Sequence, residues 1–258
     1  MRPTSVVPAL RHRRRDAGSV SVAFDGPIVT VTIGTGRRRN ALNGDAWKDL
    51  ALRIIGVSTH ASLGVVVLRG VGDTFCSGSD VTEWVGARAE DVEESFAQME
   101  AAFRAIEACP VPVIAQISGV AAGAGCQLAL SCDIRVIATS ARIGMPIARL
   151  GIRPSPAFAA RLVRAAGPAV AAELHYTGRL LQGSEAVTTG LANRCVTDDL
   201  LASSVRELVE EIGRQPTSAV RAAKEALIAA TGSAPRHALG PAVNLRDLQL
   251  GIAQILHT

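Results

Sequence analysis

The chain has 258 residues, of which 48% are hydrophobic, 19% are charged and only 3% are aromatic. This length suits one large α/β domain, or a core domain with a helical appendage. The composition excludes a small disulfide scaffold and a disordered chain. Because few aromatic rings are available to stack on bases, we also expect no nucleic-acid partner.

The formal net charge of +4 originates at the start of the chain. Residues 1–17 contain five arginines and a single acid, and the rest of the chain carries equal numbers of basic and acidic residues. A short Arg-rich segment can touch an anionic surface, but a solvated terminus is the simpler interpretation. We therefore predict that residues 1–17 form a disordered basic tail. No apolar segment follows these arginines, as a signal peptide would require.

The five cysteines do not form a disulfide framework. Their number is odd, none belongs to a CxxC pair, and most lie in apolar stretches: Cys76, Cys109, Cys126, Cys132 and Cys195. We expect reduced, buried thiols in a cytoplasmic protein. Residues 108–132 carry no charge, but prolines, glycines and glutamines interrupt them. This pattern predicts a buried strand, a turn and a buried helix rather than a membrane span.

Strand and helix periods alternate along the chain after the basic tail. Residues 20–24 and 28–33 are typical of a hairpin, and Asn43 is placed to cap a helix that continues to Ile55. The next predicted elements are a strand at 64–69, a loop at 75–80, a helix at 91–108, a strand at 111–117, a glycine turn with a helix at 119–130, and a strand at 134–138. This order predicts an α/β fold of stacked β/α units, with sheets covered on both faces.

Helices dominate the sequence after Ala157. The patterns predict a strand at 193–196 and helices at 200–213, 218–230 and 235–256. We therefore divide the chain into a basic tail (1–17), an α/β core (18–197) and a helical C-terminal region (198–258).

Several common functional motifs are missing. Gly34-Thr35-Gly36 lacks the third glycine of a dinucleotide-binding turn, and the chain has neither a GKS/GKT loop nor an HExxH motif. The five histidines are scattered without ligand spacing, so we expect no metal site. Ser77 and Ser79 flank Gly78 but are not framed as GxSxG, which argues against a serine hydrolase triad.

Three other motifs occur in order and carry more information. Asn40-Ala41-Leu42-Asn43 opens a predicted helix, Phe75–Asp80 follows an apolar strand, and Gly123–Ala129 opens another helix after a second strand. The last two present backbone N–H groups at glycine-containing turns, one of them at the positive end of a helix dipole. Two such donors aimed at one point would hold a carbonyl oxygen and stabilise an enolate.

On these motifs the chain resembles the crotonase family of enoyl-CoA hydratases and isomerases. The resemblance covers about residues 20–232 and includes further segments: Pro112–Ala115 leading to Gly119, Cys132–Arg135, Gly144–Pro146, Leu150–Ile152 and Thr177-Gly178. It implies a β/α spiral core, a helical C-terminal trimerisation region, and a homotrimer or hexamer that binds acyl-CoA. No cofactor is implied beyond the coenzyme A of the thioester itself.

The resemblance also implies roles for individual residues. The backbone N–H groups of Ser79 and Ala124 would form the oxyanion hole, and Asp80 would hold its own loop. The segment from Arg37 to Leu42 would line the adenine end of coenzyme A. Within it the residues expected at the ligand are Arg39, Asn40, Ala41 and Leu42. Lys224 matches a recurrent family lysine, which the resemblance places at the ligand. A lysine on a solvated helix face would give the same sequence pattern, so both interpretations stay open.

The chain departs from the family pattern at the two catalytic glutamates. Gln127 and Ile147 occupy the positions that the resemblance assigns to them, and neither side chain can transfer a proton near neutral pH. Glu83, Glu100, Glu107 and Asp133 are nearby in sequence and could stand in, but we expect Asp133 to be structural and the others to face solvent. A second departure is that no basic segment follows the last predicted helix.

These observations leave three hypotheses open. The first is an acyl-CoA-binding crotonase homologue with little hydratase activity, in fatty-acid or related acyl-CoA metabolism. The second is an active isomerase, thioester hydrolase or hydratase that uses a displaced acid or base. The third is a structural subunit that partners an active homologue.

Overall fold

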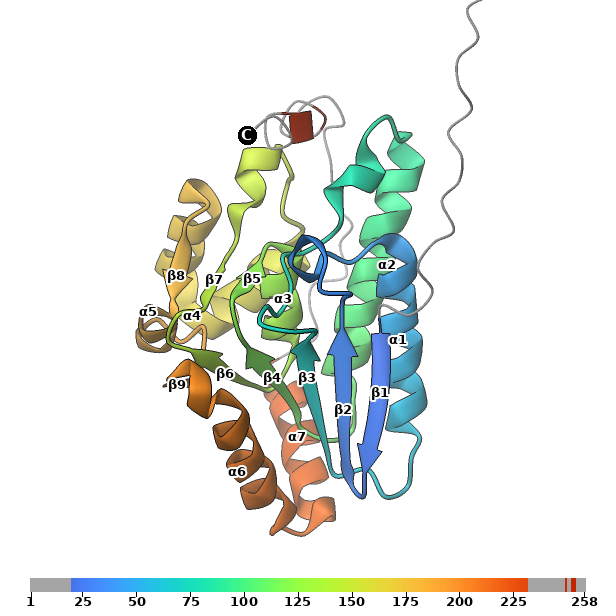
Figure 1. The fold of residues 1–258 in the computed structure, drawn as a ribbon, viewed down its shortest axis with the longest axis vertical. Coiled ribbons are helices and arrows are strands. Elements are labelled where there is room, and N and C mark those ends of the chain that lie inside the picture. Colours follow the sequence, from blue (N-terminus) through green and yellow to red (C-terminus); the bar gives the residue numbers. More distant parts are fainter. Residues whose placement is uncertain (1–19, 232–248, 250–251, 254–258) are drawn as a thin grey trace, which may run out of the picture.

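A six-stranded sheet forms the centre of the protein (Figure 1). The computed structural model describes residues 20–231, 249, 252 and 253. Strands β1 and β2 form an antiparallel hairpin, and β2, β3, β4, β6 and β9 then follow in parallel. Their bounds are β1 Val20–Asp25, β2 Ile28–Ile33, β3 Val65–Gly70, β4 Val113–Ile117, β6 Ile134–Ala138 and β9 Arg194–Val196. Because the sheet is parallel, the loops that follow β3 and β4 leave it at the same edge.

A second, three-stranded sheet begins directly after β4. It contains β5 Val120–Ala122, β7 Arg142–Gly144 and β8 Leu180–Gln182 in that spatial order. The sequence pattern predicted none of these three strands, although it did predict the equally short β9 at 193–196. Strand β5 lies within the predicted glycine turn, and the helix predicted to follow that turn begins at Ala124.

Helices cover the sheets and extend the C-terminal part (Figure 1). The α-helices are α1 Gly44–Ser58, α2 Ala89–Glu107, α3 Ala124–Ser131, α4 Pro156–Thr177, α5 Gly183–Thr188, α6 Leu201–Gly213 and α7 Thr217–Thr231. Short 3-10 helices are η1 Arg38–Asn40, η2 Val81–Trp84, η3 Pro146–Leu150 and η4 Asp198–Leu200. The predicted cap is confirmed, since the Asn43 side chain accepts a hydrogen bond of 2.9 Å from the N–H of Ala46. Both the predicted basic tail and most of the predicted helix at 235–256 lie outside the described residues.

The core is aliphatic with a small aromatic centre. Trp47 of α1 and Phe103 of α2 are fully buried, and their rings meet edge to face at 5.5 Å. Phe103 also meets Phe158 of α4 at 6.0 Å, so three helices join behind the sheet edge. These contacts fix α1, α2 and α4 around the loops that follow β3 and β4.

The cysteine and membrane predictions can be compared with the structure. All five cysteines are free, four are buried, and Cys195 is partly buried. The uncharged stretch 108–132 forms β4, β5 and α3 rather than one long helix. Among the described helices, none has the length and apolar content needed to cross a membrane.

Candidate active site

Two loops meet where β3 and β4 end. The N–H of Cys76, in the loop after β3, donates to the carbonyl oxygen of Val120 at 2.9 Å, and the N–H of Ala122 donates back to Cys76 at 3.1 Å. Cys76 and Ala121 thus form a parallel bridge between the two loops. A further bridge joins Leu42 to Ser79. The three motifs that were separate in sequence are therefore adjacent in space.

Glycine is required where these loops touch. A Cβ atom on Gly125 would lie 1.9 Å from the carbonyl oxygen of Cys76, which is a severe overlap with backbone. Gly78 has φ of +108°, and a Cβ there would lie 2.9 Å from the Ala122 oxygen and 3.2 Å from the Ala124 nitrogen. The two turns are therefore packed backbone to backbone, and this contact brings the segment of Ser79 beside the start of α3.

Two backbone N–H groups at this junction have no acceptor among the residues that the structure describes. Ser79 follows the first turn, and Ala124 is the first residue of α3, where a helix has no internal acceptor for the N–H. In the described part of the chain, neither N–H donates a hydrogen bond to a protein group. Both residues line one pocket, and Ala124 lies at the positive end of the α3 dipole. The two residues therefore border the same pocket, and their joint action as an oxyanion hole stays a prediction.

The pocket beside these amides is small and apolar. Its volume is about 80 Å³, and it is bounded by the two turns, η2, η3, α2 and α4. The side chains that form most of its wall are Val81, Trp84, Phe96, Met99, Ile147, Leu150, Ile152 and Phe158. A larger hollow of about 370 Å³ lies between Pro27, Val65 and the α6–α7 connection, and none of the predicted site residues lines it.

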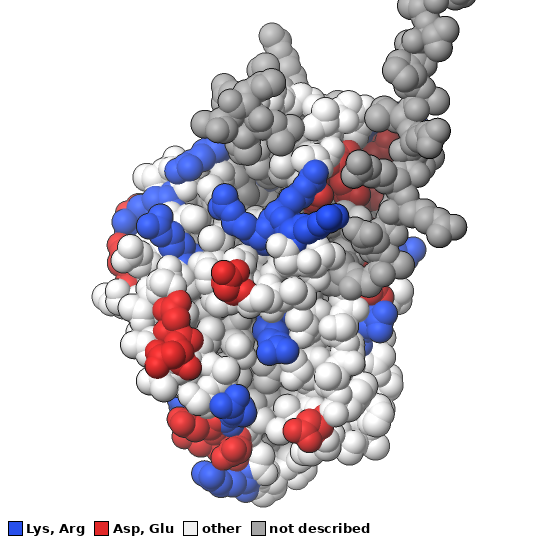
Figure 2. Space-filling model, in the orientation of Figure 1, with Lys and Arg blue, Asp and Glu red and all other residues white. Residues whose placement is uncertain are grey.

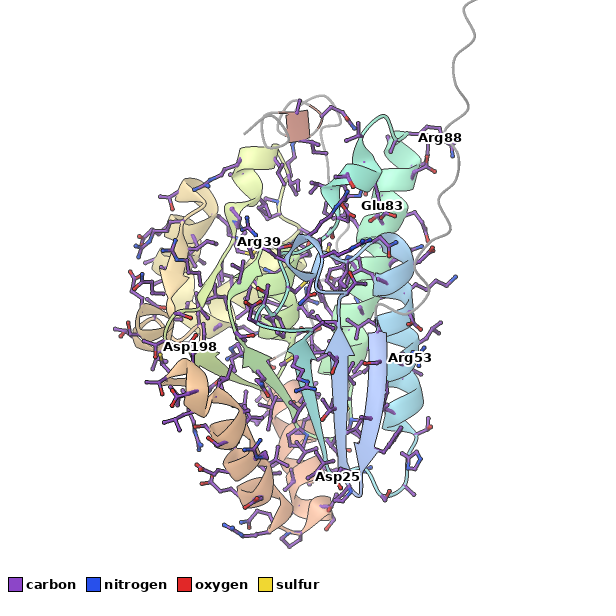
Figure 3. All side chains as sticks on the ribbon, viewed as in Figure 1. Asp25, Arg39, Arg53, Glu83, Arg88 and Asp198 are labelled. Carbon is purple, nitrogen blue, oxygen red and sulfur yellow. The ribbon has the colours of Figure 1, made fainter. Side chains whose placement is uncertain are left out.

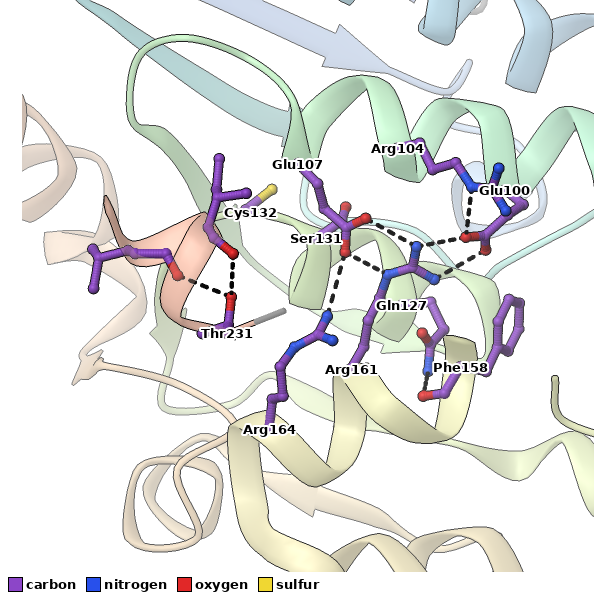
Figure 4. Close-up of polar contacts among 12 residues, drawn as sticks. Glu100, Arg104, Glu107, Gln127, Ser131, Cys132, Phe158, Arg161, Arg164 and Thr231 are labelled. Carbon is purple, nitrogen blue, oxygen red and sulfur yellow. Dashed lines mark hydrogen bonds and ion pairs between the residues drawn. The ribbon is translucent and has the colours of Figure 1, made fainter. Parts of the chain in front are cut away.

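The two positions of the missing glutamates differ in their surroundings. Ile147 lines the pocket and is 5% exposed, and a Cβ on Gly123 would contact its Cγ2 at 3.5 Å. Gln127 is fully buried and does not line the pocket. Its Nε2 donates to the carbonyl oxygen of Phe158 at 3.1 Å (Figure 4), and its Oε1 has no partner among the described residues. Gln127 therefore supports the wall residue Phe158 from behind.

None of the carboxylates considered as substitutes lines the pocket. The side chain of Glu83 accepts the N–H of Gly44 at 2.9 Å, and Asp133 accepts the N–H of Val113 at 2.7 Å. The expectation that Glu100 and Glu107 face solvent was wrong. Both bind the buried guanidinium of Arg161, and their side chains are only 17% and 32% exposed.

Arg161 ties α2 to α4 behind the pocket (Figure 4). Its side chain is 1% exposed and pairs with Glu100 and Glu107 at 2.7 Å each, and the guanidinium lies 5.1 Å from the centre of the Phe103 ring. Burial alone would lower the pKa of Arg161, but the hydrogen bonds to both carboxylates outweigh burial and raise this pKa. The carboxylates are thereby committed to an ion cluster and are not free to serve as bases in the pocket.

No side-chain nucleophile is activated at the junction. Burial raises the pKa of the Cys76 thiol to about 12, so this group stays protonated near neutral pH. The Ser79 hydroxyl accepts from Trp47 Nε1 at 3.1 Å and contacts Met99 Sδ at 3.5 Å, and the Ser77 hydroxyl donates to the Arg38 carbonyl at 2.9 Å. Since no histidine lines the pocket, neither serine has a base beside it.

The segment expected at the adenine end of the ligand has a distinctive backbone. Arg38, Arg39 and Asn40 all have positive φ between 49° and 57°. Asn40 is 1% exposed, and its amide holds the loop by accepting from Gly36 N and donating to Thr74 O at 2.6 Å. Leu42 is also fully buried. The Asn40 and Leu42 side chains are therefore structural, and Ala41 is partly buried between them.

The arginines of this segment remain on the surface. Arg38 pairs with Asp80, which also accepts from Thr82 N at 3.1 Å, so Asp80 holds its own loop as predicted. Arg37 and Arg39 form no ion pair with any described residue. Figure 2 shows basic side chains gathered over the region of η1, and Figure 3 places Arg39 there. These exposed cations suit contact with phosphate groups.

Lys224 lies elsewhere. It is 6% exposed, so the interpretation as a solvated helix residue was wrong. Its ammonium donates to the carbonyl oxygen of Val111 at 2.9 Å and to Asp133 Oδ2 at 2.7 Å, which anchors α7 below β4 and β6. Lys224 does not line the pocket, and its binding role stays a prediction.

Comparison with known proteins agrees with this arrangement. The family model of enoyl-CoA hydratase/isomerase matches residues 24–243. The chain is 31% identical over 213 residues to a short-chain-enoyl-CoA hydratase of Clostridium acetobutylicum, covering 82% of each chain. It is 33% identical over 200 residues to a crotonyl-CoA hydratase of Syntrophomonas wolfei, covering 77% of each.

A solved structure supports the same assignment. The crystal structure of an enoyl-CoA hydratase from Bacillus anthracis matches with a TM-score of 0.78 and 31% identity, covering 93% of this chain and 92% of that one. The mixed α/β core, the helical C-terminal part and the sequence matches agree with one another. This chain therefore belongs to the enoyl-CoA hydratase/isomerase family, within the crotonase superfamily.

Proposed function

We propose that this protein binds acyl-CoA thioesters and has little hydratase activity. The backbone N–H groups of Ser79 and Ala124 hold the thioester carbonyl oxygen, and the acyl group enters the apolar pocket. The observation that carries this proposal is a pocket lined by two amides without acceptors and by no described acidic or basic side chain. We place the protein in acyl-CoA metabolism, in the cytoplasm, where its five free cysteines stay reduced.

The energetics separate binding from hydration. One backbone donor of an oxyanion hole stabilises a developing oxyanion by about 3 kcal/mol. This contribution does not depend on the side chain of the donor residue. Each general acid or base contributes about 10²- to 10⁴-fold in rate. Gln127 and Ile147 supply neither, so the protein retains carbonyl binding and polarisation while water addition lacks its proton transfers.

The decisive experiment removes a single donor. Pro is tolerated at the first position of a helix, so Ala124→Pro deletes the N–H of Ala124 with little effect on α3. We expect at least about a tenfold loss of butyryl-CoA affinity by calorimetry, with no change for S-butyl-CoA, a thioether that lacks the carbonyl. Ala89→Pro, at the exposed first position of α2, is the matched control. Equal losses for both ligands would contradict the proposal.

A hydration assay completes this test. We expect wild-type protein to hydrate crotonyl-CoA far more slowly than an active relative assayed in parallel. Turnover at the relative's level would show that an acid or base reaches the substrate. It would contradict the proposal that this protein has little hydratase activity.

The names of the relatives favour a second candidate function. Sequences about 31–33% identical are named hydratases, which favours an active isomerase, thioester hydrolase or hydratase that uses an acid or base other than the two missing glutamates. Isomerisation and thioester hydrolysis both pass through an oxyanion. Mass spectrometry of a panel of CoA thioesters after incubation tests this, and absence of any product across the panel would reject it.

We also propose that the chain forms a homotrimer or hexamer through its helical C-terminal region. Leu227 and Ile228 of α7 are 66% and 46% exposed, which leaves apolar surface available for a neighbouring copy. Light scattering after size-exclusion chromatography measures the mass directly, and a monomer at micromolar concentration would contradict this proposal.

A further inference from the structure

Helix α4 is broken in the middle. Gly167 has φ of 77° and ψ of 166°, which lie outside the helical region, and Pro168 follows it without an N–H to donate. The break separates a first half, residues 156–166, from a second half, residues 168–177. Apart from its chain neighbours, no described residue would lie within 4 Å of a Cβ atom on Gly167. The position of the first half is therefore fixed by its contacts with other elements rather than by the continuity of the helix.

The first half of α4 carries part of the pocket wall. Phe158 lines the pocket and is 5% exposed. Helix α2 contributes Phe96 and Met99 to the same pocket. The pocket therefore keeps its shape only while the first half of α4 stays at a fixed distance from α2.

Arg161 joins the first half of α4 to α2 through four hydrogen bonds (Figure 4). It follows Phe158 by three residues, so both side chains lie on one side of the helix. Its guanidinium binds both oxygens of Glu100, from Nη1 at 2.9 Å and from Nη2 at 2.7 Å. It also binds both oxygens of Glu107, from Nε at 2.7 Å and from Nη2 at 3.1 Å. Because the donors of a planar guanidinium point in set directions, these bonds fix the orientation of the two helices as well as their distance.

Ring contacts lead from Arg161 back to the pocket. The guanidinium lies 5.1 Å from the centre of the Phe103 ring, and Phe103 meets Phe158 edge to face at 6.0 Å. The backbone of Phe158 has two neutral hydrogen bonds: its carbonyl oxygen accepts from Gln127 at 3.1 Å, and its N–H donates to Ser155 Oγ at 3.2 Å. Charge-assisted bonds are about twice as strong as neutral ones. The bonds of Arg161 are therefore the main polar contact that holds this segment.

We infer that Arg161 is a positioning residue, which holds the first half of α4 against α2 and so keeps Phe158 in the pocket wall. Arg161 does not line the pocket itself, so it acts through Phe158. The inference rests on the proposed function, because it concerns the wall against which the acyl group is held. When the bonds of Arg161 are weakened, the break at Gly167 lets the first half move without the second.

Arg161→Lys tests this role by calorimetry with butyryl-CoA and with free coenzyme A. Lysine keeps the positive charge, but one ammonium cannot form two bidentate pairs. We expect the ratio of butyryl-CoA affinity to coenzyme A affinity to fall at least about fourfold, the value of one buried methylene. The affinity for coenzyme A alone should stay within about twofold of wild type, because α4 carries no residue expected at that part of the ligand.

Arg179→Lys is the matched control. Arg179 also binds two glutamates, Glu173 at 2.7 Å and Glu185 at 2.9 Å, but it is 43% exposed and does not line the pocket. The affinity ratio of this variant should stay within about twofold of wild type. An equal fall in both variants would overturn the inference, since the location of Arg161 behind the pocket would then not matter.

Hydrogen exchange gives a second readout that needs no ligand. In Arg161→Lys we expect the amides of residues 160–166 to exchange at least about tenfold faster than in wild type. Residues 172–177 should stay within about twofold, because the break uncouples the two halves. Saturating butyryl-CoA, but not coenzyme A, should slow the first half again. Faster exchange in both halves alike would show only a loss of overall stability and would overturn the inference.

The outcomes distinguish this inference from the proposed function. If wild type binds butyryl-CoA no more tightly than coenzyme A, the proposed acyl binding fails, and hydrogen exchange still decides whether Arg161 holds the first half of α4. If wild type prefers butyryl-CoA and Arg161→Lys keeps both this preference and slow exchange, the inference is overturned. Glu107→Gln is a milder change for the case in which Arg161→Lys does not fold. It should shift both readouts in the same direction by about two- to threefold, and wild-type values in both would again overturn the inference.

Discussion

The side-chain amide of Gln127 lies 3.1 Å from the carbonyl oxygen of Phe158 and donates a hydrogen bond to it. This contact joins α3, which carries Ala124 at its start, to α4, which carries Phe158 in the pocket wall. A glutamate at position 127 would place a carboxylate against that carbonyl oxygen. The amide therefore suits the buried position in which the structure places it.

Gln127→Glu should destabilise the protein in a pH-dependent way. Burial without a donor raises the pKa of the new carboxyl above its unfolded value of about 4.3. A group whose pKa is raised on folding costs nothing below the unfolded pKa and destabilises progressively as pH rises above it. We expect near wild-type stability at pH 4 and a loss of about 2 kcal/mol at pH 7, measured by urea unfolding. Gln215→Glu, at an exposed position, should show neither effect.

Restoring both carboxylates should restore hydration in part. Ile147 lines the pocket, so Ile147→Glu places an acid or base beside the polarised thioester. Combined with Gln127→Glu, it should raise crotonyl-CoA hydration at least about tenfold above wild type, given the usual contribution of one such group. Pairing Gln127→Glu with Ile147→Gln is the control, since glutamine has the same shape but no basic oxygen. A double-Glu variant that binds butyryl-CoA yet stays at the wild-type rate would mean that the water position itself is missing.

The contact between the two turns should make Gly125 irreplaceable. Gly125→Ala would force a Cβ to within 1.9 Å of the Cys76 oxygen, so the turns must separate. We expect a loss of about 3 kcal/mol of stability by thermal or urea unfolding, together with loss of acyl-CoA binding. Gly56→Ala in α1 has open space around it and should instead stabilise the protein by about 0.5–1 kcal/mol. Equal effects of the two changes would exclude a special role for the turn contact.

Short-range patterns in the sequence predicted the long elements, and the resemblance to the crotonase family implied the junction. The cap at Asn43 and the apolar strands depend on neighbours in sequence, and the structure confirms them. The contacts of Arg161 depend on α2 and α4 meeting in space, and for that reason Glu100 and Glu107 were misjudged as solvent-facing. An Arg in an otherwise apolar helical turn, Ala160-Arg161-Leu162, was the available signal. The sequence pattern predicted none of the strands β5, β7 and β8, which pair only with one another in the second sheet.

Arg39 should contribute to the affinity for coenzyme A. Its guanidinium is exposed near the junction and has no ion-pair partner among the described residues. Arg39→Ala should weaken butyryl-CoA binding about three- to tenfold at low ionic strength, and the difference should shrink at 0.5 M salt because salt screens surface charges. Arg53→Ala, which removes an exposed arginine paired with Asp49 on α1, is the matched control. An effect of Arg39→Ala that does not depend on salt would argue against a phosphate contact.

The same substitution at the two lysines of the chain separates the effect of Lys224 on stability from its effect on ligand binding. Lys224→Met removes the donor to Val111 and the partner of Asp133, and we expect a loss of about 2 kcal/mol in urea unfolding. Butyryl-CoA affinity should stay within about twofold of wild type, because Lys224 does not line the pocket. Lys48→Met makes the same change at an exposed position of α1 and should alter neither quantity. If Lys224→Met is as stable as wild type but binds butyryl-CoA tenfold more weakly, Lys224 belongs to the coenzyme A site. Its contacts with the ligand would then be absent from an isolated chain.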